Sequence, residues 1–188
     1  LFDIKFVQSA DVMYLCHPAH PPAKLSRTGD ISWTLTDVEF TKGPFQDVNI
    51  TTTTLTPASA GVGTGVDITA SAITGINGGV GWLSTDVGRQ IYFNSGYAVI
   101  TARTSATVAV ATITTAFTNT NAITAWQLGS FSDTTGFPSC VTFFEQRLVF
   151  AGTTNQPQTV FFSKSGDYEN MDANIGGTVA DSDAIIYT

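Results

Sequence analysis

The stretch from Ser139 to Asp167 reads SCVTFFEQRLVFAGTTNQPQTVFFSKSGD and has the densest strand pattern in the chain. It holds three apolar runs: Val141–Phe144, Arg147–Ala151 and Thr159–Phe162. Their β-branched and aromatic residues suit a pleated sheet, and polar breaks at Glu145–Gln146 and Gly152–Pro157 separate them. Because Gly, Asn and Pro in the second break favour chain reversal, the stretch predicts a three-stranded antiparallel meander.

A weaker copy of this pattern lies near the N-terminus. The segment Phe6–Asp30 has the same length as Phe143–Asp167, and both end in similar pentapeptides, Ser-Arg-Thr-Gly-Asp and Ser-Lys-Ser-Gly-Asp. We interpret the two segments as a repeat. A small antiparallel sheet cannot bury both of its faces alone, so repeated sheets of this kind predict blades packed around an axis or a tandem sandwich.

The first copy is expected to hold strands at Leu1–Gln8 and Val12–Cys16, a Pro-rich loop that carries both histidines, and a strand leading into Ser26. A fourth strand is predicted over Asp30–Phe40, with Ile31, Trp33 and Leu35 on one face. Four strands in about forty residues match the size of a propeller blade. A further strand is predicted to begin at Ala184–Tyr187, and little or no helix is expected.

Between the copies the composition shifts to Thr, Ala, Gly, Val and Ile. Short strands are predicted at Asn49–Leu55, Val66–Ala70, Gln90–Phe93, Ala98–Ala102, Thr107–Ile113 and Ala122–Leu128. The predicted fold class is therefore all-β: antiparallel blade-like meanders, propeller- or sandwich-like, that flank an inserted small β-barrel or sandwich. The expected domains are residues 1–46 with 127–188, and residues 47–126 as the insert.

Charge narrows the range of partners. Only 12% of the residues are charged, about half the usual share, and the formal net charge is −7. The eight basic residues are scattered, so tight nucleic-acid binding is not expected. No apolar run reaches the roughly 18 residues of a membrane span. Low charge favours a surface in contact with other protein, and the opening on Leu1 within a strand suggests a piece of a longer protein.

Metal and thiol chemistry have little support. Cys16, His17 and His20 are ligand types, but zinc normally takes four ligands and no second Cys/His pair follows, so no metal site and no cofactor are expected. Cys16 and Cys140 cannot build a disulfide framework. Both lie in apolar runs, which predicts two buried free thiols.

Two chemical alternatives stay open. Carboxylate pairs two residues apart on a strand, Asp37 with Glu39 and Asp167 with Glu169, would suit a polysaccharide depolymerase, although such pairs are more often solvated. Aromatic residues of the insert, Trp82, Tyr92, Phe93 and Tyr97, could instead stack on a sugar ring in a carbohydrate or host-receptor module. Neither pattern is specific enough to predict an enzymatic activity.

Several motifs together resemble structural tail proteins of short-tailed phages and prophages, of the tail-tubular, nozzle or packaged-DNA stabilisation kind. The resemblance is carried by Asp11–Arg27, Gly43–Phe45, Thr134–Pro138, Phe144–Phe150 and Pro157–Asn170, with Asp86–Arg89 and Thr101–Ala106 in the insert.

The resemblance implies a β-propeller-like hub with an inserted β-domain, no active site, and a place in the virion tail after assembly in the bacterial cytoplasm. The implied partners are further copies of the chain and other tail proteins. An acidic chain fits this expectation, because an acidic wall repels phosphate and would let DNA slide through a conduit. A host glycan remains the alternative partner.

Overall fold

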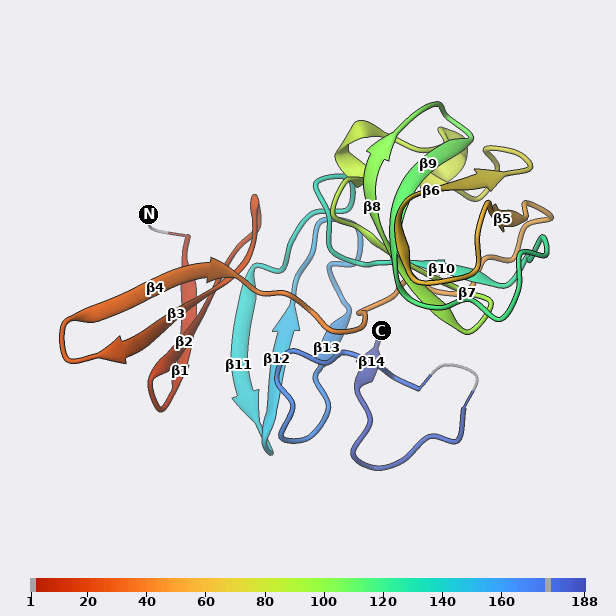
Figure 1. Cartoon of the computed structure of the whole chain (residues 1–188). Helices are drawn as coiled ribbons and strands as arrows, with labels where there is room; N and C mark the ends of the chain where they lie inside the picture. Colours follow the sequence, from red (N-terminus) through yellow and green to blue (C-terminus); the bar gives the residue numbers. More distant parts are fainter. Residues whose placement is uncertain (1–2, 175–176) are drawn as a thin grey trace. The chain divides into compact units, whose positions relative to one another are not determined.

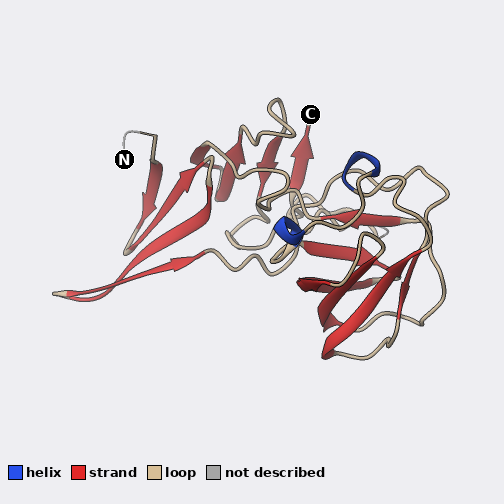
Figure 2. Cartoon of the chain, turned by 90° about the horizontal axis from the view of Figure 1, so that it is seen from above, coloured by secondary structure: helices blue, strands red, loops and turns tan. Residues whose placement is uncertain are grey.

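The computed structural model describes residues 3–174 and 177–188 (Figure 1). It is nearly all-β and antiparallel, which confirms the predicted fold class. Figure 2 shows mainly strands and loops, with short helical turns between them. Within the described ranges these turns are the 3₁₀ segments η1 (Asn77–Gly79) and η2 (Ser84–Asp86), in line with the expectation of little helix.

The chain divides into two compact units. Unit 1 comprises Leu1–Pro44 and Thr135–Thr188, and unit 2 comprises Phe45–Thr134. The second boundary lies beyond the expected residue 126 because strand β10 (Trp126–Leu128) pairs with β7 (Gln90–Phe93) of unit 2.

Unit 1 contains two four-stranded antiparallel meanders, each with its strands in chain order. Sheet 1 consists of β1 (Lys5–Ser9), β2 (Val12–His17), β3 (His20–Gly29) and β4 (Ser32–Asp37). Sheet 2 consists of β11 (Cys140–Phe144), β12 (Arg147–Ala151), β13 (Val160–Phe162) and β14 (Ile185–Tyr187). Sheet 2 confirms the predicted three-stranded meander and the separately predicted strand at Ala184–Tyr187, which pairs with β13 as a fourth strand.

Tight turns set the register of both sheets. Ala10 and Asp11 link β1 to β2, and Glu145 and Gln146 link β11 to β12. Ala10, Glu145 and Gln146 have positive φ values of 50°, 44° and 61°, a conformation that short hairpin turns require. A two-residue turn therefore opens both meanders, although φ is positive at both turn positions only in the Glu145–Gln146 turn.

The prediction of a Pro-rich loop in the first copy is wrong. His17 ends β2 and His20 begins β3, so only Pro18 and Ala19 lie between the strands. Pro21 and Pro22 lie inside β3, where the pairing with β2 shifts register between Leu15 and His17. Proline is tolerated there because a bulge does not need every backbone N–H for the ladder.

Unit 2 is one curled six-stranded sheet in the order β10-β7-β8-β9-β6-β5 (Figure 1). Its remaining strands are β5 (Leu55–Pro57), β6 (Gly63–Ala70), β8 (Gly96–Arg103) and β9 (Val108–Thr115). Backbone hydrogen bonds in both directions, 2.9 and 3.0 Å long, join Leu55 of one edge strand to Ile123, shortly before the other edge strand. The curl encloses a core that includes Leu55, Ile68, Ile91, Phe93, Ile100, Ile113 and Trp126.

One predicted strand of unit 2, Asn49–Leu55, is wrong, since β5 begins only at Leu55. The Asn49 side chain accepts hydrogen bonds from Thr51 N and Thr51 Oγ1, and it donates to the carbonyls of Thr51, Thr53 and Thr124. Local side-chain bonds of this kind compete with a strand ladder. The segment is therefore an ordered loop.

A buried ion pair braces the curled sheet. Arg89, 1% exposed, lies with its Nη1 atom 3.0 Å from Oδ1 of the fully buried Asp86. Its Nε donates to the Gly129 carbonyl at 2.8 Å, and its Nη2 donates to Gln46 Oε1 at 2.8 Å. Burial lowers the pKa of the Arg89 guanidinium, and Asp86 opposes that shift. The group stays charged, because arginine has a very high intrinsic pKa.

We predict that Asp86→Asn lowers the free energy of unfolding of unit 2 by about 3 kcal/mol, because it leaves a buried cation without its partner. Denaturant titration followed by tryptophan fluorescence measures this, since Trp82 and Trp126 are buried in unit 2. Asp67→Asn is the matched control on an exposed position of β6, and its cost should stay below about 0.5 kcal/mol. Equal costs for the two variants would contradict the bracing role.

Candidate interaction surface

The carboxylates considered for catalysis lie in different surroundings. Asp37 and Glu39 are exposed. Both oxygens of Glu169 lie 2.8 Å from Lys24 Nζ, and Glu169 also accepts a hydrogen bond of 3.2 Å from the Tyr14 hydroxyl. Burial, and then the neighbouring Glu169 charge, raise the pKa of Tyr14. Glu169 therefore ties its own segment to β2 and β3.

The expected sugar-stacking residues are largely internal. Trp82 is fully buried and Tyr97 is 7% exposed. The partly buried Tyr92 ring packs against Tyr97 and Phe45, with centroid distances of 4.9 and 5.9 Å. Phe93, named with them, is also fully buried. A stacking platform needs an exposed ring face, so these residues do not form one in this structure.

The two thiols differ, which corrects the prediction that both are buried. Cys16 is buried, whereas Cys140 is exposed at the start of β11. Burial raises the pKa of the Cys16 thiol to about 12. The imidazole rings of His17 and His20 lie 5.1 Å apart, and among the described residues no three His, Cys, Asp or Glu side chains gather as a metal site would require.

Strand register assigns each side chain of sheet 1 to one of two faces, because directly paired residues point the same way. The inner face of sheet 1 carries Val7, Val12, Tyr14, Cys16 and Lys24. The outer face of sheet 1 carries Phe6, Met13, Leu15, Leu25, Trp33 and Leu35.

The same reasoning divides sheet 2. Its inner face carries Val141, Phe143, Leu148, Phe150, Phe161 and Ile186. Its outer face carries Phe144, Arg147, Val149, Phe162, Ile185 and Tyr187.

The two inner faces meet through aromatic contacts. The Tyr14 ring stands edge-on to Phe143, with centroids 6.1 Å apart and an interplanar angle of 81°. Tyr168 contacts both rings, at 6.4 Å from Tyr14 and 4.8 Å from Phe143. Leu148, Phe150 and Phe161 are fully buried beneath them. These contacts make the core of unit 1.

Both outer faces keep large apolar side chains in solvent. On the outer face of sheet 1, Phe6 is 63% exposed, Trp33 55% and Leu35 66%. On the outer face of sheet 2, Phe144 and Tyr187 are also more than half exposed. Apolar surface gathered on one face of a sheet marks an interaction site more often than isolated exposed residues do.

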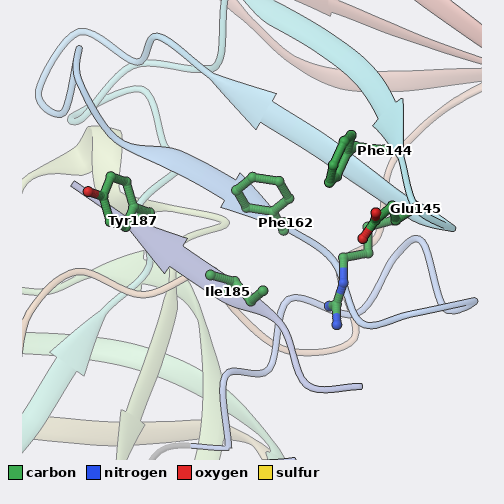
Figure 3. Close-up of a pocket in the computed structure, with 6 residues that line it drawn as sticks. Phe144, Glu145, Phe162, Ile185 and Tyr187 are labelled. Carbon is green, nitrogen blue, oxygen red and sulfur yellow. The ribbon is translucent and has the colours of Figure 1, made fainter. Parts of the chain in front are cut away.

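The outer face of sheet 2 is hollowed into a groove of about 300 Å³ (Figure 3). Phe144, Phe162, Ile185 and Tyr187 come to it from three strands, with Glu145 at one end. Arg147, which also lines the groove, donates hydrogen bonds of 2.6 Å to the carbonyls of Ser163 and Asp183, and a further one to Asp181. Three of its guanidinium N–H groups are therefore satisfied by the backbone.

An ion pair holds the segment before β14. Lys164 Nζ lies 2.8 Å from Asp183 Oδ1, and the Ala180 N–H donates to Asp183 Oδ2 at 2.8 Å. The hydrogen bond from Lys164 and then that from Ala180 lower the pKa of Asp183. These bonds keep Ile185 and Tyr187 beside the groove.

Together these features define the class of the chain: an all-β protein whose candidate site is a pair of exposed apolar sheet faces. No helix among the described residues has the length and apolar character to cross a membrane. Comparison with models of known protein families gives no match, and comparison with curated proteins gives none either.

Sequence reasoning placed Ile31, Trp33 and Leu35 on one face of a strand. Trp33 and Leu35 do share a face of β4, whereas Ile31 lies in the turn before it, and the exposure of this face was not predicted. The groove was missed because Phe144 and Tyr187 lie far apart in the sequence. The sequence did carry one usable signal. Two sheets that pack against each other bury one face of each, so the second face of each sheet stays exposed.

We predict that one thiol of the native chain reacts with a thiol-specific reagent at pH 8 and that a second reacts only in denaturant. The thiolate is the reactive form, and Cys16 combines burial with a raised pKa. Absorbance of the released chromophore measures the two rates. Cys140→Ser should abolish the fast reaction and Cys16→Ser should spare it; the reverse pattern would contradict the assignment.

Proposed function

We propose that the chain is a structural component of a phage or prophage tail, of the hub or nozzle kind, without catalytic activity. It acts in the assembled virion by self-association and shape around a DNA conduit, after assembly in the host cytoplasm. One observation carries the proposal: unit 1 leaves an apolar face of each of its sheets exposed. Such faces suit a subunit built to be covered by other protein.

The charge of the chain supports this role. The chain has 15 acidic and eight basic residues, so its net charge repels DNA phosphates. A wall of this sign permits a genome to pass without adhering to it. The motif resemblance points to the same kind of protein, and the other partners would be neighbouring tail proteins.

The glycan-binding alternative has weaker support. It depended on exposed rings at Trp82, Tyr92 and Tyr97, and the first and last of these are buried. The depolymerase alternative depended in part on Glu169, which Lys24 and Tyr14 engage. Neither alternative retains an observation that favours it over assembly.

Particles released by a strain that encodes the chain provide the test. We expect gold-labelled antibodies against the chain to bind the tail end of purified particles, with preimmune serum as the control. The chain should also remain in the particles after a high-salt wash, because the proposed contacts are apolar. Particles that lack the chain, while the cell lysate contains it, would refute the proposal.

A further inference from the structure

The two hairpins that open the sheets of unit 1 provide a geometric reference. In sheet 1 the turn is closed by the pair Ser9–Val12, and in sheet 2 by the pair Phe144–Arg147. Both connections contain only the turn residues described above, so the closing pairs are equivalent positions. Superposing the hairpins therefore shows which faces of the two sheets correspond.

One closing pair lies on an inner face and the other lies on an outer face. Ser9 and Val12 share the inner face of sheet 1 with Tyr14, whereas Phe144 and Arg147 share the outer face of sheet 2 with Val149. The inner face of sheet 1 is therefore equivalent to the outer face of sheet 2. By the same superposition, the outer face of sheet 1 is equivalent to the inner face of sheet 2.

The predicted sequence repeat is offset by two residues from the turn alignment, but it assigns the faces in the same way. It aligns Phe6 with Phe143, which lie on the outer face of sheet 1 and the inner face of sheet 2. The alignment of the two copies by the repeat and their alignment by the turns differ by two residues. Since side chains alternate along a strand, a shift of two residues leaves every side chain on the same face.

The contact inside unit 1 is thus head-to-tail, because two non-equivalent faces meet at Tyr14 and Phe143. A contact of this kind leaves one face of each type free, and those free faces can form the same contact again. The free faces are the outer face of sheet 1 and the outer face of sheet 2. They are the two exposed apolar faces described above.

We propose that the outer face of sheet 1 in one copy of the chain packs against the outer face of sheet 2 in a second copy. The contact continues the head-to-tail arrangement already present within each copy. This inference rests on the self-association in the proposed function and names the surfaces that perform it.

The chemistry of the two faces suits this contact. Phe6, Trp33 and Leu35 supply large apolar side chains, and the groove between Phe144, Phe162 and Tyr187 offers a concave apolar surface to receive them. Arg147 already donates to three backbone carbonyls, so covering the groove leaves most of its hydrogen bonds in place.

The head-to-tail geometry makes a specific prediction for mixed variants. Leu35→Lys disables the outer face of sheet 1, and Tyr187→Lys disables the outer face of sheet 2. Both residues are more than 60% exposed, at 66% and 71%, so the variants should fold. In an equimolar mixture, the intact outer face of sheet 1 comes from Tyr187→Lys copies and the intact outer face of sheet 2 comes from Leu35→Lys copies.

Sedimentation velocity measures the outcome. We expect the unmodified chain to form species that grow with concentration, each variant alone to remain monomeric, and the mixture to form one-to-one dimers and nothing larger. Ile50→Lys, at a 98% exposed position of unit 2, is the matched control and should associate like the unmodified chain. Circular dichroism confirms that each variant is folded.

Three results would overturn the inference: a monomer at all concentrations for the unmodified chain, dimers of either variant alone, or a mixture without dimers. Dimers of one variant alone would mean that like faces pair. The particle-labelling experiment is independent of this one. Head-to-tail dimers without labelled tails would refute the assignment to a tail. Labelled tails without such dimers would refute only the proposed contact surfaces.

Discussion

A four-stranded sheet has two faces, and each apolar face needs a covering layer; this constraint organises unit 1. Its two meanders cover each other on one side only, through Tyr14, Phe143 and Tyr168. The remaining apolar faces stay in solvent, at a cost of about 25 cal/mol for each Å² of apolar surface left uncovered. In the proposed role, self-association covers these exposed apolar faces.

Unit 2 meets the same constraint within itself. Its six strands curl into one sheet whose concave side encloses its own core, and its edges are joined through Leu55 and Ile123. The buried Asp86–Arg89 pair then ties η2 and the start of β7 to Gly129 and Gln46. Unit 2 thus covers the core side of its own sheet, whereas each sheet of unit 1 leaves an apolar face exposed.

Prediction from the sequence succeeded where local pattern dominates. The strands Gln90–Phe93 and Arg147–Ala151 were predicted with their observed limits, because dense β-branched and aromatic runs lie between turn residues. It failed where side chains act over a distance or compete locally: Asn49 forms a loop, Cys140 is exposed and Trp82 is buried. The candidate surface depends on register between distant strands, which alternation along one strand does not reveal.

The inner faces of the two sheets of unit 1 meet at Tyr14 and Phe143. A double-mutant cycle with Tyr14→Leu, Phe143→Leu and the double variant tests this contact directly through the free energy of unfolding of unit 1. We expect a coupling energy of about 0.5 to 1.5 kcal/mol, as is typical of aromatic pairs in contact. Strictly additive effects of the two substitutions would contradict it.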